Sequence, residues 1–267
     1  MRYLDRGEIR LAWDEQGSGP PILLIMGHRY SSGMWYPVLE GLGDRYRLTY
    51  FDNRGTGRSG RRTRTSIAEL ADDARAVMDA AGLGSAHVYG VSMGGGIALE
   101  FAIRFPERVR SLVLGCTMAK TPDITPKPHW MLHVLYRLPT FLLKALAPKT
   151  HKGGYGDDAP DDAIARDRAI LEKDPFSRRG VLAQAIAISD YSVTREQIGA
   201  VTAPALVLHG DQDLTVPFEA GEALSEMLPN ARFLPLKGVG HNYFVGAGDV
   251  ANAAVDRFIQ EVEGERA

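Results

Sequence analysis

Cysteine is nearly absent from this chain, because Cys116 is the single cysteine among 267 residues. An internal disulfide framework is therefore excluded, and we expect a reducing, cytoplasmic location. Cys116 ends an apolar stretch, which predicts a packed thiol rather than a nucleophile. An excess of charge is also missing, since the formal net charge is −2. Neither nucleic acid nor an anionic membrane surface is therefore an expected partner.

Sequence patterns of several other protein classes are missing too. Residues 1–6 contain no apolar core of a secretory signal. The most apolar stretch, residues 130–146, is short and is interrupted by Arg137, Pro139 and Lys144, so we expect no membrane span. There is no glycine-rich phosphate loop, dinucleotide fingerprint or paired metal-ligand motif. We therefore expect no cofactor and no metal, and the oligomeric state stays unknown.

The chain does contain an alternation of short apolar runs and amphipathic helical patterns. The runs that predict strands occupy residues 8–14, 22–26, 46–51, 86–91, 109–115, 204–210 and 232–236. The patterns that predict helices occupy residues 34–42, 67–81, 93–105, 219–228 and 249–262. This alternation predicts βαβ units and an α/β fold with a mostly parallel, doubly wound sheet.

The alternation is interrupted between residues 117 and 199. A proline-rich linker covers residues 121–128, and helical patterns follow at residues 161–173 and 180–189. We therefore predict one core made of residues 1–116 and 200–267, with a helical insertion at residues 117–199. We expect one face of the apolar stretch of this insertion to pack on the core and another face to line a substrate pocket. Its candidate pocket residues are Trp130, Val134, Leu138 and Phe141.

One short motif has the form of a nucleophile elbow. Ser92 stands between an apolar strand and a helical pattern, with Gly90 and Gly94 two residues away on either side. A serine on such a sharp turn lies in strained backbone space, and glycine avoids collisions with the neighbouring strand and helix. The turn also aims the first N–H groups of the helix at the site of the reaction. Ser92 is therefore the candidate nucleophile.

A serine hydroxyl needs a base, and the base needs an orienting acid. His241 follows the last expected strand and is the candidate base, whereas His209 closes a strand and is expected to be a packed core histidine. Asp211 and Asp213 both follow residues 205–209, and sequence order alone permits either as the acid. Asp211 lies at the mouth of the strand, where we expect it to accept local backbone N–H groups.

Taken together, these motifs resemble those of the α/β-hydrolase family. The matching segments, in family order, are residues 52–59 (DNRGTGRS), 90–94 (GVSMG), 209–217 (HGDQDLTVP) and 240–241 (GH). The resemblance covers residues 4–262 apart from the insertion. It implies a triad in the order Ser92, Asp213, His241, with the insertion as a cap over the active site. Met34 and Trp35, together with the loop at residues 52–59, make the chain similar to enol-lactonases and small carboxylesterases, and the cofactor-free haloperoxidases look similar too.

The resemblance also implies an oxyanion hole formed by the backbone N–H groups of His28 and Met93. Related enzymes often carry His-Gly or Asn-Ser where this chain has Met26 and Gly27, so the His28 side chain is an unusual candidate contact for substrate. The pattern around Arg54 could also form an anion site with another arginine of its loop. The resemblance favours a scaffold role instead, with Arg54 bracing nearby backbone.

The expected activity is that of a cofactor-independent serine hydrolase acting on a small carboxylic ester or lactone. Serine at the elbow excludes the dehalogenases that use an aspartate nucleophile. The same residues would also support hydrolysis of C–C bonds in β-diketone-like substrates, or haloperoxidase and perhydrolase chemistry. A ligand receptor on the same fold is the non-enzymatic alternative.

Overall fold

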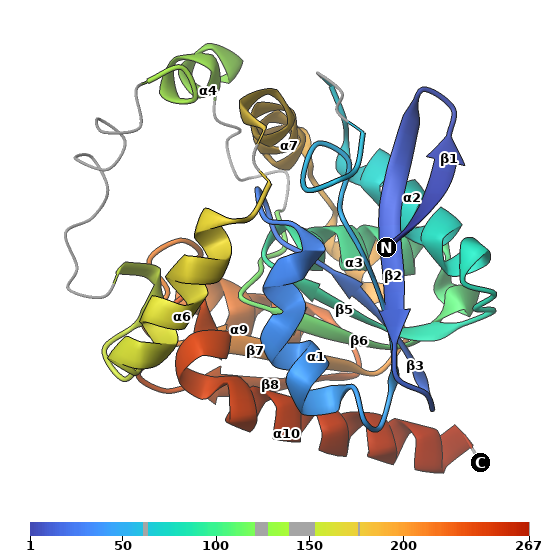
Figure 1. The fold of residues 1–267 in the computed structure, drawn as a ribbon. Coiled ribbons are helices and arrows are strands. Elements are labelled where there is room, and N and C mark those ends of the chain that lie inside the picture. Colours follow the sequence, from blue (N-terminus) through green and yellow to red (C-terminus); the bar gives the residue numbers. More distant parts are fainter. Residues whose placement is uncertain (61–63, 121–127, 139–152, 176, 267) are drawn as a thin grey trace.

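The computed structural model describes residues 1–60, 64–120, 128–138, 153–175 and 177–266 (Figure 1). These residues form one eight-stranded sheet with the order β1-β2-β4-β3-β5-β6-β7-β8. Strand β2 is antiparallel to β1 and to β4, and every other neighbouring pair is parallel. The expected α/β fold with a mostly parallel sheet is therefore confirmed.

The strands lie close to the apolar runs that predicted them. They are β1 (Arg2–Arg6), β2 (Ile9–Gln16), β3 (Pro21–Ile25), β4 (Arg47–Phe51), β5 (Ala86–Val91), β6 (Val109–Gly115), β7 (Ala205–Gly210) and β8 (Ala231–Leu236). Each expected strand begins and ends within two residues of its observed position. Strand β1 was not expected, because its side chains are mostly exposed at the edge of the sheet and show no apolar alternation.

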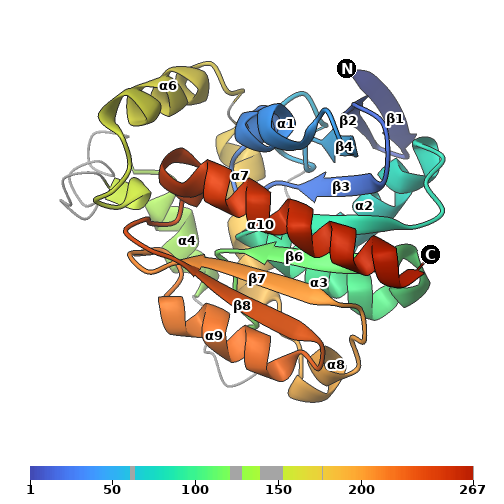
Figure 2. The same ribbon diagram turned by 90° about the horizontal axis from the view of Figure 1, so that it is seen from below.

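Helices cover both faces of the sheet (Figure 2). Helices α1 (Tyr36–Leu42) and α10 (Tyr243–Arg266) lie on one face, and α2 (Ile67–Ala80), α3 (Met93–Arg104), α8 (Arg195–Gly199) and α9 (Phe218–Met227) lie on the other. Strand β3 is buried between the two layers: Leu23 and Ile25 pack into one core, and Ile22 and Leu24 into the other. A parallel strand with both faces covered needs such a continuous apolar run.

Helix α2 begins where its sequence pattern predicts. Ser66 Oγ accepts a hydrogen bond from Glu69 N at 3.1 Å, and Glu69 Oε2 accepts one from Ser66 N at 3.1 Å. This reciprocal capping box satisfies two backbone donors that have no partner inside the helix. The helix then buries a continuous face that includes Leu70, Ala74 and Val77.

The segment between β6 and β7 is helical in its described part and contributes no strand there. It contains α4 (His129–Leu135), the short 3-10 helix η3 (Gly153–Tyr155), α6 (Asp161–Glu172) and α7 (Arg178–Asp190), followed by α8. Figure 1 shows α4 and α7 at the top of the view and α6 at the left. Helix α10 is longer than expected, because it begins at Tyr243 and continues through a break at Ala247.

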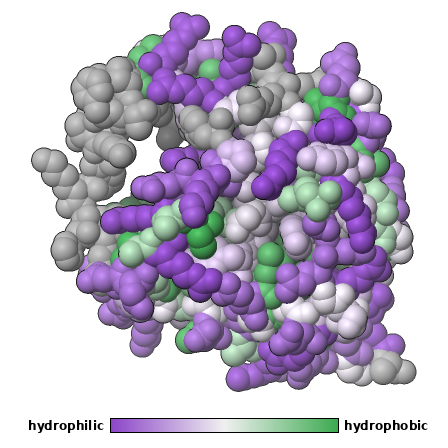
Figure 3. Space-filling model, viewed as in Figure 1, coloured by the Kyte–Doolittle hydropathy of each residue, from purple (hydrophilic) through white to green (hydrophobic). Residues whose placement is uncertain are grey.

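The face seen in Figure 3 is mostly hydrophilic, with small hydrophobic areas scattered over it. In the described part of the chain, no helix combines the length and the apolar character that crossing a bilayer would require.

Candidate active site

Ser92 occupies a strained turn between β5 and α3. Its backbone angles are φ +56° and ψ −123°, in a region that residues other than glycine rarely adopt. A Cβ on Gly90 would lie 2.1 Å from the Gly94 carbonyl oxygen, and a Cβ on Gly94 would lie 2.0 Å from the Ile25 carbonyl oxygen. Both glycines are therefore required by close backbone approach, and the expected elbow geometry is confirmed.

His241 and Asp213 form a direct pair beside this turn. His241 Nδ1 lies 2.7 Å from Asp213 Oδ2, although the loops that carry the two residues follow different strands, β8 and β7. Because a carboxylate can only accept, His241 carries its proton on Nδ1 and leaves Nε2 unprotonated when the ring is neutral. That arrangement is the one a general base needs.

The Asp213 side chain is fully buried, and its carboxylate is surrounded by donors. Asp213 Oδ1 accepts hydrogen bonds from Thr215 N at 2.7 Å and Val216 N at 3.0 Å. Burial alone would raise the pKa of Asp213, but hydrogen bonds from His209 and His241 outweigh it. The net result is a pKa well below the usual value of an aspartate, so this carboxylate is ionised at neutral pH.

Asp211 has a different position. Its Oδ1 accepts a hydrogen bond from Gly238 N at 2.8 Å, which joins it to the loop after β8. The expectation that Asp211 accepts local backbone N–H groups is wrong, because the local N–H groups of this loop donate to Asp213 instead. Asp213 lies two residues further along the loop, where the backbone of Thr215 and Val216 folds over its carboxylate. Asp211 is exposed.

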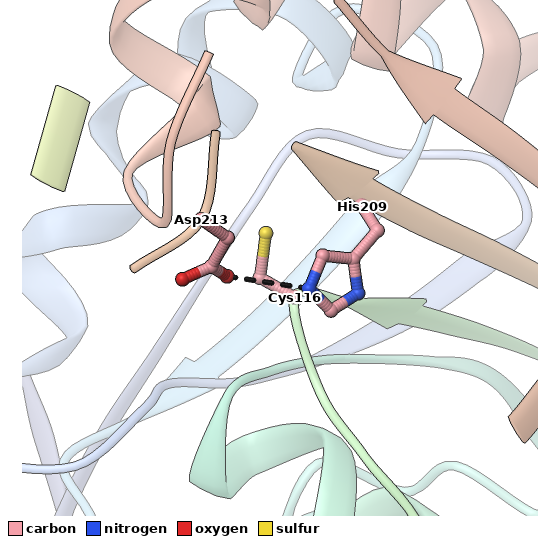
Figure 4. Close-up of side chains that lie close together, drawn as sticks. All are labelled: Cys116, His209 and Asp213. Carbon is pink, nitrogen blue, oxygen red and sulfur yellow. Dashed lines mark ion pairs between the residues drawn. The ribbon is translucent and has the colours of Figure 1, made fainter. Parts of the chain in front are cut away.

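A second histidine, His209, also contacts the Asp213 carboxylate. His209 is fully buried, and its Nε2 lies 3.3 Å from Asp213 Oδ2 (Figure 4). The same nitrogen lies 3.1 Å from the Val216 carbonyl oxygen. With a proton on Nε2, the ring donates toward both oxygens. Sequence reasoning predicted the burial of His209 but missed this contact, for which the four-residue spacing to Asp213 was the available signal.

Cys116 completes this buried cluster. In the described part of the chain, Cys116, His209 and Asp213 are the group whose donor atoms, all within 4.8 Å of one another, could hold a metal ion. Burial first, and then the charge of Asp213, raises the pKa of the Cys116 thiol well above its usual value. Both oxygens of the Asp213 carboxylate are already engaged in hydrogen bonds with Thr215, Val216 and His241. The cluster is better explained as packing and hydrogen bonding that hold Asp213 in place.

Ser92 and His241 line the same cavity, which has a volume of about 60 Å³. The other lining residues are Met26, Gly27, His28, Tyr30, Met34, Val91, Asp167, Asn242, Phe244 and Val245. A Cβ on Gly27 would lie 3.2 Å from Ser92 Cβ, so the loop after β3 passes directly beside the serine. Met93 is the first residue of α3, and its N–H is among those that have no acceptor within the helix.

Comparisons with known proteins agree with this architecture. The family described as "alpha/beta hydrolase fold" matches residues 20–154, and the family described as "TAP-like protein" matches residues 188–266. The chain belongs to the α/β-hydrolase family. The resemblance carried by the elbow, the loop after β4 and the residues after β7 is therefore confirmed.

The relatives of this α/β hydrolase are named for different activities. It is 30% identical over 271 residues to the "Putative carbamate hydrolase RutD" of Azorhizobium caulinodans, covering 98% of this chain and all of that protein. It is also 30% identical over 285 residues to the "Putative non-heme bromoperoxidase BpoC" of Mycobacterium tuberculosis, covering 96% and 99% of the two chains. Among solved structures, a thermophilic esterase from Thermogutta terrifontis superposes with a TM-score of 0.82 at 25% identity, covering 95% and 94%. The similarity to small esterases is confirmed.

The side chain of His28 is tied to α7. His28 Nε2 lies 2.8 Å from the Val181 carbonyl oxygen, and burial lowers the pKa of the ring. The neutral imidazole therefore donates its Nε2 proton to α7. The backbone after His28 is held by α7 and by the turn after α6. Arg29 N donates to Gln184 Oε1 of α7 at 3.0 Å, and Ser31 N donates to Asp174 Oδ2 of the turn at 3.0 Å.

The guanidinium of Arg54 is occupied by partners in α2. Its guanidinium donates to both carboxylate oxygens of the buried Asp73, with Nε 2.6 Å from Oδ2 and NH2 2.7 Å from Oδ1. A third hydrogen bond, from NH1 at 3.1 Å, reaches Glu69. The scaffold role of Arg54 is confirmed, but its contacts join two side chains and do not brace backbone as expected.

The apolar stretch of the insertion does not reach the cavity in its described part. Trp130 is 69% exposed and Val134 is 53% exposed, and neither lines the cavity around Ser92. Leu138 is half-buried at the end of the described segment. Phe141, with residues 139–146 of the same stretch, lies outside the described residues. Among the described residues of the insertion, the one that lines the cavity is Asp167, on α6, which sequence reasoning did not single out.

Proposed function

We propose that this α/β hydrolase is a serine hydrolase that cleaves a small carboxylic ester or lactone without a cofactor. One observation carries the proposal: Ser92, on a strained turn, shares a cavity with His241, whose Nδ1 is hydrogen-bonded to the buried Asp213. A nucleophile, a base and an orienting acid are the groups that acyl transfer requires.

In the proposed reaction, Ser92 Oγ attacks the substrate carbonyl carbon while His241 Nε2 takes the hydroxyl proton. Asp213 stabilises the imidazolium that forms, because its carboxylate remains ionised. The backbone N–H groups of His28 and Met93 donate to the oxyanion of the tetrahedral intermediate. His241 then protonates the departing alkoxide, which leaves Ser92 acylated.

In the second half of the reaction, water takes the place of the Ser92 hydroxyl as nucleophile and Ser92 becomes the leaving group. A water molecule gives its proton to His241 and attacks the acyl carbon, and the collapse of the second intermediate returns the proton to Ser92 Oγ. The products are the carboxylic acid and the free enzyme. In a lactone the alkoxide and the acid belong to one molecule, so the product is a hydroxy acid.

We also propose that residues 117–199 act as a cap on a core of residues 1–116 and 200–267. The contacts of His28, Arg29 and Ser31 with α7 and the turn after α6 support this arrangement. The name of the carbamate hydrolase relative favours one further substrate class, since a carbamate carbonyl would be attacked in the same way.

The test is the Ser92→Ala variant together with an active-site label. The variant should keep the melting temperature of the wild type and lose roughly 10³-fold or more in ester turnover. A serine-reactive phosphonate should add mass to Ser92 in the wild type and to no residue in the variant. Ester turnover retained by Ser92→Ala would overturn the mechanism. A panel of esters, lactones, carbamates and β-diketones would then rank the substrate classes.

A further inference from the structure

Helix α6 carries a carboxylate on its buried face. Ile164 and Asp167 point inward one turn apart, whereas the neighbours Arg166 and Arg168 are exposed. Asp167 is only 4% exposed and lines the cavity that contains Ser92. An ionised carboxylate is costly to bury unless other groups stabilise it, so the partners of Asp167 show how it is maintained.

These partners are two neutral phenols. Tyr36 Oη donates to Asp167 Oδ1 at 3.1 Å, and Tyr155 Oη donates to Asp167 Oδ2 at 2.9 Å. Burial first, and then the negative charge of Asp167, raises the pKa of both phenols, so both keep the protons that they donate. Within the described ranges, Asp167 takes part in no ion pair with a cationic side chain. Its charge is therefore stabilised by hydrogen bonds and is not neutralised by a direct contact.

The rest of the described cavity wall supplies no permanent opposing charge, because its basic side chains are the histidines His28 and His241. Asp167 is the one carboxylate among the described lining residues, and these include no lysine or arginine. Arg29 follows the lining residue His28 directly but does not itself line the cavity. Its guanidinium lies over the Tyr30 ring, 5.4 Å from the ring centroid. The volume of about 60 Å³ is well below the roughly 150 Å³ of a protein cavity that holds benzene. The group that enters beside Ser92 is therefore short.

We propose, resting on the serine-hydrolase function above, that Asp167 makes the cavity selective for a short substrate group that ends in a hydrogen-bond donor. Each carboxylate oxygen accepts one phenol proton and has a further lone pair for a hydroxyl or an ammonium group of the substrate. A substrate carboxylate is excluded, because two like charges repel strongly in a buried cavity. The substrate class is thus a short hydroxyacyl or aminoacyl ester, and dicarboxylic half-esters are poor substrates.

The test compares four esters of p-nitrophenol that differ only in the acyl group: butyryl, 3-hydroxypropionyl, β-alanyl and hemisuccinyl. The p-nitrophenyl group is too large for the cavity, so the acyl group enters it. The 3-hydroxypropionyl and β-alanyl esters should exceed the butyryl ester in kcat/KM by about 10-fold, the scale of a hydrogen bond to a charged acceptor. The hemisuccinyl ester should fall below the butyryl ester by about 10-fold or more.

Two variants of α6 separate a local effect from a general one. Asp167→Asn keeps the size of the side chain and an oxygen for one tyrosine but removes the charge, so the four kcat/KM values should fall within about 3-fold of one another. Glu172→Gln removes a carboxylate from an exposed position of the same helix and should leave the wild-type ranking unchanged. Melting temperatures show whether each variant is folded. If Asp167→Asn does not fold, the wild-type ranking of the four esters still decides the question.

Three kinetic results would overturn the proposal: donor-bearing esters hydrolysed no faster than the butyryl ester, a hemisuccinyl ester hydrolysed as fast as the butyryl ester, or a ranking that Asp167→Asn leaves unchanged. Failure of the underlying function would look different, because the wild type would then hydrolyse none of the four esters. Selectivity can still be measured in that case by calorimetric binding of the four matching primary amides to the Ser92→Ala variant. Amide binding without preference for the donor-bearing groups would reject the role of Asp167 independently of turnover.

Discussion

Replacing Asp213 with asparagine tests the proposed triad through the hydrogen bonds around one side chain. Two backbone N–H groups, from Thr215 and Val216, donate to Oδ1, so the amide oxygen of the introduced asparagine must occupy that position. The amide NH₂ group then faces His241 Nδ1 and His209 Nε2, which are 2.7 Å and 3.3 Å from the present Oδ2. His241 can accept from this group only by moving its own proton to Nε2.

The kinetic loss follows from that tautomer. A ring protonated on Nε2 cannot take the proton of Ser92, so kcat should fall by about 10²- to 10⁴-fold, equivalent to about 3–5 kcal/mol of transition-state stabilisation. Stability should fall as well, because His209 faces a donor and can relieve the conflict only by giving up its hydrogen bond to Val216 O. One lost buried hydrogen bond costs about 1–3 kcal/mol.

The matched control is Asp211→Asn, two residues away. Its amide oxygen can still accept from Gly238 N, so kcat should stay within about 3-fold of the wild type and the free energy of unfolding should fall by less than about 1 kcal/mol. The assay is kcat at saturating ester together with unfolding in urea. If Asp213→Asn retains kcat within about 10-fold while Asp211→Asn loses more than 100-fold, Asp213 is not the acid.

Two further predictions concern stability. Gly94→Ala should lose about 3 kcal/mol or more of unfolding free energy, because its Cβ would lie 2.0 Å from the Ile25 carbonyl oxygen; Gly264→Ala, where a Cβ meets nothing within 4 Å, should lose none, and equal losses would contradict the close approach. Burial lowers the pKa of His87 to about 4, so the unfolded chain binds more protons between pH 4 and pH 6.5 and stability falls as the pH falls. The wild type should lose about 2 kcal/mol from pH 7 to pH 5 by this cause. His87→Gln should lack that loss, and an unchanged pH slope in this variant would refute the assignment.

The parts of the site that could be predicted from sequence are those with local signals. The elbow is local, because the steric demands of Ser92 fall on glycines two residues away. The choice between Asp211 and Asp213 is not local, since it depends on which carboxylate meets His241, 28 residues further along the chain. Asp167 gave no signal either: an aspartate inside a charged helix is usually exposed, and its burial depends on Tyr36 and Tyr155 from other segments.

The hydrogen bonds between the loop after β3 and the segment from α6 to α7 bear on how substrate reaches Ser92. The loop that carries the His28 N–H is fastened at Val181 and Gln184 of α7 and at Asp174 just after α6. A hinged opening of α7 would therefore move the His28 N–H, the proposed oxyanion donor, away from Ser92. Under the proposed mechanism, substrate access and catalytic competence are thermodynamically linked, because a conformation that widens the cavity on this side also displaces the proposed donor. Substrate should instead pass through a route that leaves these hydrogen bonds intact, and mutations that loosen them should lower kcat rather than speed binding.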